Sequence, residues 1–176
     1  MKTTGNTTWP LIDSLRSESD AAAFKQINEE WITRMFSMTD EDRKLLEDPV
    51  ARIIAPGGDV LLARSDDSTV VGCIALLPYG NRVFELAKMG VTPHARGQGI
   101  GRRLVAAAID RARELSAERI FLGTNSQLGP AIHLYEEAGF RRISREDLPV
   151  ADYYARADIL MELGLTSLSP GGSRGT

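Results

Sequence analysis

The chain has 176 residues, of which 43 % are hydrophobic and 26 % are charged, and its formal net charge is −3. This length fits one globular domain, and the composition excludes a disordered or fibrous chain. The slight acidic excess argues against a general nucleic-acid-binding protein, which usually has a basic face. Cys73 is the only cysteine, and His94 and His133 are the only histidines. We therefore expect no internal disulfide and no metal centre.

No apolar run approaches the roughly 20 residues that a membrane-spanning helix needs. Residues 1–8 are polar and contain no apolar core for export. We therefore expect a soluble, cytoplasmic protein without a membrane partner. Residues 1–165 are predicted to form a single domain, and residues 166–176, rich in glycine and serine, a flexible tail.

The first half of the chain predicts two helices followed by three strands. Apolar residues at helical spacing predict a helix over residues 21–36, which Ser19 or Asp20 would cap. A short acidic helix is expected over residues 40–48, and Pro49 would end it. A turn at residues 56–58 and a hairpin loop at residues 65–68 separate the strands, which are predicted over residues 59–63, 69–77 and 82–91.

The second half alternates helices and strands. An amphipathic helix is predicted from Gly99 to Leu115, and a second helix over residues 130–138, which Gly139 would end. Short strands are predicted over residues 119–122, 141–143 and 157–163. This order indicates a mixed α/β sandwich built around one sheet.

A glycine-rich turn joins the third predicted strand to the amphipathic helix. Gly97, Gly99 and Gly101 alternate in this turn. Glycine lets backbone amides approach a ligand closely, and a helix N-terminus adds unpaired N–H groups and a partial positive charge. With Arg96 and Arg102 beside them, these features predict an anion site suited to a pyrophosphate. The alternative is an ordinary tight turn, because a short glycine motif is weak evidence alone.

Two other phosphate-binding motifs can be excluded. The dinucleotide fingerprint Gly-x-Gly-x-x-Gly requires a third glycine where this chain has Arg102 or Leu104. A P-loop requires Gly-Lys followed by Ser or Thr, and this triplet does not occur in the sequence. Neither NAD nor a nucleoside triphosphate is therefore favoured.

Residues 96–101, Arg-Gly-Gln-Gly-Ile-Gly, resemble the acetyl-CoA-binding motif of the GNAT family of N-acetyltransferases, Arg/Gln-x-x-Gly-x-Gly/Ala. Residues 134–140, Leu-Tyr-Glu-Glu-Ala-Gly-Phe, are similar to the second signature of that family. The resemblance extends over about residues 14–163. Residues 85–89 and 124–126 look most like the acetyltransferase half of MarR–GNAT fusion proteins. The winged-helix half is missing, so DNA binding is not implied.

The resemblance implies a mixed, mostly antiparallel central sheet of about six to seven strands flanked by about four helices. It also implies acetyl-CoA as co-substrate, with its pyrophosphate on the turn and its pantetheine arm along the preceding strand. Asn125 would bind the pantetheine amides or orient a water, although asparagine also ends a strand well. The implied cofactor-binding residues are Met89, Gly90, Val91, Arg96, Gly97, Gln98, Gly99, Ile100, Gly101, Arg102 and Asn125.

Acetyl transfer requires a neutral amine, a stabilised oxyanion and a protonated leaving thiolate. Tyr135 matches the tyrosine that protonates the thiolate in the resembling family. A phenol with a pKa of about 10 is a plausible donor to a departing thiolate with a pKa of about 8.5 or above. The alternative is that Tyr135 only packs on its helix. The oxyanion donor is expected to be a backbone N–H near Met89.

Glu85 interrupts an apolar strand, and a carboxylate at such a position usually has a binding partner or a function. In histone-acetylating members of the resembling family, a glutamate at the matching position deprotonates the amine, often through water. Strand alternation would place Glu85 on the same face as Ala87 and Met89. Two alternatives remain open: Glu85 pairs with Arg82 or Lys88, or it only attracts a cationic acceptor.

Residues 13–48 contain ten acidic and five basic residues, a local net charge of −5. In the resembling fold the first helices border the acceptor groove, and an acidic border would attract a cationic amine. A solvated acidic face is an equally good interpretation.

The sequence thus predicts an acetyl-CoA-dependent N-acetyltransferase that acts on a primary amine of a small molecule, amino acid or peptide. No cysteine lies near either motif, which favours direct transfer in a ternary complex over a covalent acetyl-enzyme. The alternatives are a protein-lysine acetyltransferase and a non-catalytic acyl-CoA-binding sensor. The expected partners are the acceptor and, through the resemblance, a second copy in a homodimer, but no nucleic acid.

Overall fold

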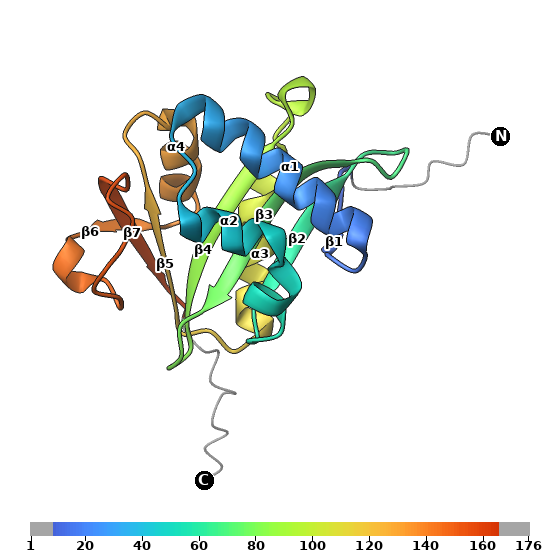
Figure 1. Cartoon of the computed structure of the whole chain (residues 1–176). Coiled ribbons are helices and arrows are strands. Elements are labelled where there is room, and N and C mark those ends of the chain that lie inside the picture. Colours follow the sequence, from blue (N-terminus) through green and yellow to red (C-terminus); the bar gives the residue numbers. More distant parts are fainter. Residues whose placement is uncertain (1–8, 166–176) are drawn as a thin grey trace, which may run out of the picture.

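The computed structural model describes residues 9–165. A seven-stranded sheet in the order β1-β2-β3-β4-β5-β7-β6 forms its centre, with helices on both faces (Figure 1). Neighbouring strands are antiparallel except for β4 and β5, which are parallel. The predicted mixed, mostly antiparallel sheet is confirmed. Its strands are β1 (Leu11–Ser14), β2 (Asp59–Arg64), β3 (Val70–Pro78), β4 (Val83–Val91), β5 (Arg119–Thr124), β6 (Arg141–Ile143) and β7 (Ile159–Gly164).

Four α-helices flank the sheet in the described part of the chain, as predicted: α1 (Glu18–Met35), α2 (Asp40–Glu47), α3 (Ile100–Glu114) and α4 (Gly129–Glu137). Shorter helical turns occur at Val50–Ile54, Pro93–Ala95 and Arg145–Asp147. None of the helices in residues 9–165 has the length and hydrophobicity of a transmembrane segment. The polar segment at residues 1–8 and the predicted tail at residues 166–176 lie outside the described residues.

Several element ends differ from the sequence prediction. Helix α1 begins earlier because Ser17 caps it, accepting the backbone N–H of Asp20 at 3.1 Å. The Asp20 carboxylate instead binds Arg64 of β2, at 2.9 Å for each of two contacts. After α2 the chain continues as a π-helix at Val50–Ile54. Strand β1 was not predicted, because its four residues are too few for a clear alternation.

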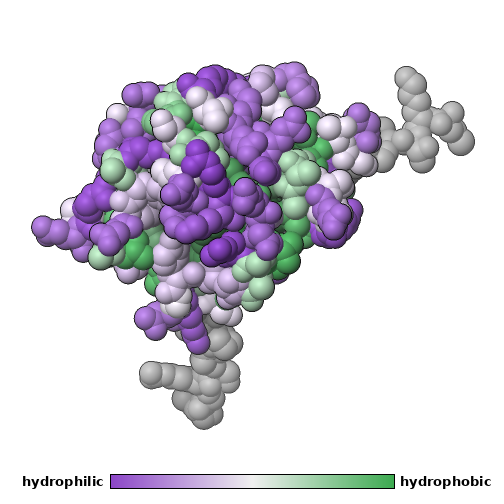
Figure 2. Space-filling model, in the orientation of Figure 1, coloured by the Kyte–Doolittle hydropathy of each residue, from purple (hydrophilic) through white to green (hydrophobic). Residues whose placement is uncertain are grey.

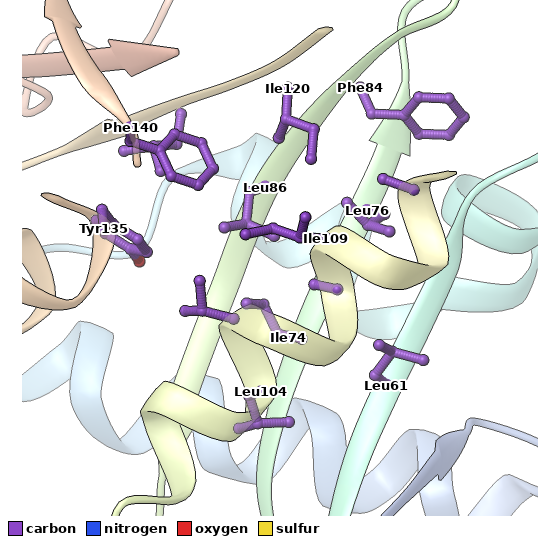
Figure 3. Packing of buried hydrophobic residues seen from close by; sticks show 14 of the residues in the cluster. Leu61, Ile74, Leu76, Phe84, Leu86, Leu104, Ile109, Ile120, Tyr135 and Phe140 are labelled. Atoms are coloured by element: carbon purple, nitrogen blue, oxygen red, sulfur yellow. The ribbon is translucent and has the colours of Figure 1, made fainter. Parts of the chain in front are cut away.

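Two hydrophobic clusters hold the helices against opposite faces of the sheet. On the α3 face, Leu104 and Ala108 are fully buried against β3 and β4 side chains such as Ile74 and Leu86 (Figure 3). On the α1–α2 face, a second cluster contains Phe24, Ile32, Leu46 and Ile53 together with alternate residues of β2 and β3. Figure 2 shows mostly hydrophilic side chains over the outer side of α1 and α2. The middle strands are therefore covered on both sides.

Candidate functional site

The most prominent feature is a cleft between β4 and β5. The two strands pair only at their first residues, and their ladder ends where Glu85 is opposite Phe121. Beyond this pair, a cleft of about 860 Å³ opens, lined by both strands, by α1, by the glycine turn, by α4 and by residues 153–157. Groups from either face of the sheet can therefore reach one ligand.

One edge of β4 faces this cleft. Its other edge stays paired with β3 as far as Val91. Beyond Glu85 the cleft edge has no strand partner in residues 9–165, so its backbone amides and carbonyls can bind an extended ligand that carries amide groups. The predicted arm-binding residues Met89, Gly90 and Val91 all line the cleft here.

A β-bulge at Lys88 changes the direction of the side chains along β4. Lys88 has a φ of 54°, and one extra residue interrupts the register with β3. Glu85 precedes the bulge and is paired with Leu77, which packs on the α1–α2 face, where Lys88 also binds Asp42 at 2.6 Å. Met89 instead packs on the α3 face. The prediction that Glu85 and Met89 share a face was wrong, because the bulge shifts the alternation by one residue.

Glu85 is 2 % exposed, and its carboxylate accepts hydrogen bonds from two tyrosines. The Tyr79 hydroxyl donates at 2.8 Å and the Tyr153 hydroxyl at 2.6 Å. Burial raises the pKa of Glu85, and the two hydrogen bonds oppose part of that rise. Such a carboxylate is suited to accept a proton near neutral pH. The alternative pairing with Arg82 or Lys88 is wrong, because both cations bind other carboxylates.

Tyr153 reaches Glu85 by crossing β5 at Gly123. A Cβ at position 123 would lie 2.1 Å from the Tyr153 ring, so only glycine leaves room for it. The ring also packs edge-on against Phe121, with 6.0 Å between centroids. Sequence reasoning missed Tyr79 and Tyr153, since neither belongs to a motif. A glycine inside a strand was the only local signal.

Tyr135 lines the same cleft from the α3 face. It lies on α4 and packs edge-on against Phe140, with 5.9 Å between ring centroids (Figure 3). Burial raises the pKa of Tyr135, so its hydroxyl stays protonated and can act as a proton donor. Glu85 and Tyr135 thus approach the cleft from opposite faces of the sheet, through the opening between β4 and β5.

The glycine turn has the backbone that an anion site needs. Gly97 and Gly99 have φ values of 77° and 78°, a left-handed conformation that favours glycine, and Gly99 caps α3. The first N–H groups of α3 therefore point out of the helix end. Arg96 fixes the turn by donating to the Val91 carbonyl at 3.2 Å. The predicted turn residues that line the cleft are Arg96, Gly97, Gly99, Ile100, Gly101 and Arg102.

Two predicted cofactor residues have bonds within the protein. The Gln98 side chain donates to the His94 carbonyl at 3.5 Å, and Gln98 is outside the cleft lining. Asn125 lines the cleft and holds the neighbouring loop. Its amide donates to the Arg156 carbonyl at 2.7 Å and accepts the Gln127 N–H at 2.9 Å. Its contact with a pantetheine arm stays a prediction.

A buried ion cluster lies at the α2 side of the cleft. The Asp42 side chain is fully buried and binds Lys88 at 2.6 Å and Arg156 at 2.8 and 2.9 Å. Burial alone would raise the pKa of Asp42, but the hydrogen bonds from Arg156 and Lys88 hold it well below its usual range. Sequence reasoning missed this cluster, because its members are far apart along the chain.

The acidic stretch of residues 13–48 does not make the cleft acidic. Most of its carboxylates form ion pairs, such as Asp20 with Arg64 and Glu30 with Arg34. Within residues 9–165, Glu85 is the only carboxylate that lines the cleft. The cations that line it are Arg34, Lys88, Arg96, Arg102 and Arg156. The interpretation as a solvated acidic face therefore fits better than an acidic acceptor border.

Within the described part of the chain, no group of three or more His, Cys, Asp and Glu side chains could hold a metal ion. The Cys73 thiol is buried against Asn28, and burial raises the pKa of Cys73 to about 12. This thiol is outside the cleft lining.

Comparisons with known proteins agree with this geometry. The model of the acetyltransferase (GNAT) family matches residues 21–140. An N-acetyltransferase of Schizosaccharomyces pombe, described as uncharacterized, is 29 % identical over 136 residues, which cover 74 % of this chain and 82 % of that protein. A mycothiol acetyltransferase of Sanguibacter keddieii is 34 % identical over 138 residues, which cover 73 % of this chain but 42 % of that longer protein.

Solved structures share the fold. A GNAT-family acetyltransferase from Staphylococcus aureus superposes with a TM-score of 0.80 at 24 % identity, covering 89 % of this chain and 100 % of that one. YncA from Salmonella typhimurium, a putative acetyltransferase solved with acetyl-CoA, gives a TM-score of 0.69 at 21 % identity and covers 94 % and 99 %. The likeness to MarR–GNAT fusions rests only on residues 85–89 and 124–126.

Proposed function

Because the chain belongs to the acetyltransferase (GNAT) family, we propose that it moves the acetyl group of acetyl-CoA directly to a primary amine. The acceptor is a small molecule, an amino acid or a peptide, and the reaction runs in a ternary complex. The observation that carries this proposal is the cleft between β4 and β5. It combines an anion-binding turn, an unpaired strand edge, a buried carboxylate and a buried phenol.

The cleft residues fit the parts of acetyl-CoA. The N–H groups of residues 98–102 would bind the pyrophosphate, because they lie where the turn with the left-handed Gly97 and Gly99 leads into α3. The cleft edge of Met89–Val91 would bind the amides of the pantetheine arm, as an added strand does. Arg96 and Arg102, which line the cleft and are paired with Glu30 and Glu137, would add positive charge for the phosphates. When bound, acetyl-CoA supplies an acetyl thioester with an electrophilic carbonyl carbon.

The transfer needs two proton movements, and the cleft offers one group for each. The amine nitrogen forms a bond to the acetyl carbon, and the carbon–sulfur bond breaks. Glu85 takes the amine proton, directly or through water, and Tyr135 gives its proton to the departing thiolate. A backbone N–H near Met89 would stabilise the oxyanion. Cys73 is buried outside the cleft, which supports direct transfer without an acetyl-enzyme.

Thiol release tests the proposal. Purified protein is mixed with acetyl-CoA and a panel of amines, and free CoA thiol is measured over time. We expect release that depends on one class of amine. Release with lysine-containing peptides alone would favour the protein-lysine acetyltransferase. Binding of acetyl-CoA without release from any amine or peptide would favour the non-catalytic sensor.

The role of Tyr153 gives a prediction about pH. Tyr153→Phe removes one hydrogen bond that opposes the raised pKa of Glu85, so that pKa should rise further. A base works only when it is deprotonated. As the pH is lowered, the variant should therefore begin to lose activity at a higher pH than the unmodified enzyme does. The measurement is kcat/KM against pH, in which the acidic limb should shift to higher pH. A lower plateau with an unmoved limb would mean that Tyr153 acts only through packing.

A further inference from the structure

Two cations share one carboxylate at the α2 side of the cleft. Oδ1 of Asp42 accepts from Lys88 and Arg156, and Oδ2 accepts from Arg156 and from the Thr39 N–H. The Asp42 side chain is fully buried, so its oxygens are saturated by these four donors. Two positive charges therefore face one negative charge. Glu85 is the other carboxylate close enough to Lys88 to interact with its charge.

Arg156 keeps one edge of its guanidinium free for a ligand. Nη1 binds Asp42 and the Ser37 carbonyl, and Nη2 uses one hydrogen on Asp42. Among residues 9–165, no acceptor binds Nε or the second hydrogen of Nη2. These two N–H groups are parallel and match the two oxygens of a carboxylate. The rings of Tyr154 and Phe36 lie 4.9 and 5.7 Å from the guanidinium carbon and hold its plane.

The Arg156 side chain is accessible from the cleft. Arg156 is one of the lining residues, and its side chain is 21 % exposed, whereas Lys88 is 5 % exposed. The other lining cations differ: Arg96 and Arg102 belong to the glycine turn and would meet the phosphates of CoA, and Arg34 on α1 is paired with Glu30. Arg156 is therefore the cation best able to contact the acceptor.

The charged side chains that line the cleft disfavour a purely cationic acceptor. Glu85, the only carboxylate that lines the cleft within residues 9–165, already accepts two tyrosine hydrogen bonds and is needed to take a proton. A diamine would bring a second positive charge beside Lys88 and Arg156 without a carboxylate to receive it. An acceptor with a carboxylate would instead pair with the free edge of Arg156.

We propose that the acceptor carries a carboxylate as well as its amine, and that Nε and Nη2 of Arg156 bind this carboxylate. The substrate class is a free amino acid or a related amino carboxylic acid, not a diamine and not a lysine within a peptide. This inference rests on the proposed acetyl transfer and names the acceptor class of the same site.

The first test needs no variant. Thiol release is measured with L-amino acids, each beside its own carboxamide, with β-alanine and 4-aminobutyrate as spacing probes, and with putrescine. A carboxamide keeps the amine and the side chain but removes the negative charge. The lost pair is charged and bidentate, so we expect kcat/KM for the best amino acid to exceed that of its carboxamide by about tenfold or more. Putrescine should be the poorer substrate.

The second test locates the preference at Arg156. Arg156→Gln should lower kcat/KM for the amino acid by about tenfold or more beyond any change for the carboxamide, mainly through KM, so that the preference for the acid is lost. Arg156→Lys should keep part of the preference, because lysine keeps the charge but lacks the planar edge. Arg52→Gln is the matched control, since Arg52 is exposed and outside the cleft, and it should change neither value. Thermal unfolding checks that each variant is folded.

The outcomes separate this inference from the proposed function. A carboxamide or putrescine acetylated as fast as the amino acid would overturn the inference and leave acetyl transfer intact. Acetyl-CoA binding without release from any amino carboxylic acid would also overturn it. Absence of acetyl-CoA binding would overturn the proposed function itself. If Arg156→Gln does not fold, the comparison of the amino acid with its carboxamide on the unmodified protein still tests whether the acceptor needs a carboxylate.

Discussion

Glu85→Gln is expected to lower kcat by about 10²- to 10⁴-fold at neutral pH, within the usual contribution of general acid–base catalysis. Glutamine has the same size, and its carbonyl can still accept a tyrosine hydrogen bond at this buried position. It cannot take the amine proton. Initial rates of thiol release measure kcat, and calorimetric titration measures acetyl-CoA affinity, which should be retained.

The pH dependence sharpens this test. Burial raises the pKa of Glu85, so in the unmodified enzyme activity should fall as the pH falls through that raised pKa and protonates the carboxylate. Glu85→Gln should lose this acidic limb. Glu118→Gln is the matched control, because Glu118 is exposed and pairs with Arg82 away from the cleft. An unchanged kcat in Glu85→Gln would remove Glu85 from the mechanism.

Tyr135→Phe should lower turnover about tenfold or more while acetyl-CoA binding survives. The ring would keep its edge contact with Phe140, so packing on α4 changes little. Only the hydroxyl is lost, and burial holds its pKa high enough to keep it protonated. The departing thiolate would then have to take its proton from water.

The control for Tyr135→Phe comes from binding and stability. The dissociation constant for acetyl-CoA and the midpoint of thermal unfolding should match those of the unmodified protein. Turnover that is also unchanged would make Tyr135 a packing residue, as the alternative interpretation of the sequence has it. Loss of acetyl-CoA binding would mean that the hydroxyl contacts the cofactor and not the leaving group.

The site residues that lie close together in the sequence could be predicted from it. The glycine turn over residues 96–101 and the Tyr135 helix are local patterns, and both contribute residues to the lining of the cleft. The sheet was also predictable, because its central strands are strongly apolar runs separated by clear turns. Strand β1 escaped notice, since four residues at a sheet edge carry almost no periodic signal.

The remaining features depend on contacts between distant residues. Arg156 and Asp42 are 114 positions apart, and Tyr153 and Glu85 are 68 apart, so no local pattern links them. The bulge at Lys88 is invisible to an alternation rule, yet it decides which side chains share a face. The number of acidic residues over residues 13–48 gave the correct local net charge, but it did not show that most of these carboxylates form ion pairs.

Calorimetric titration of the purified protein with acetyl-CoA, followed by thiol release with the amine panel, tests the central claim most directly. We predict micromolar binding in the cleft between β4 and β5 and release of CoA thiol with a carboxylate-bearing amine. An absence of binding would mean that the turn at residues 97–101 is only a structural turn, and would contradict the proposed function.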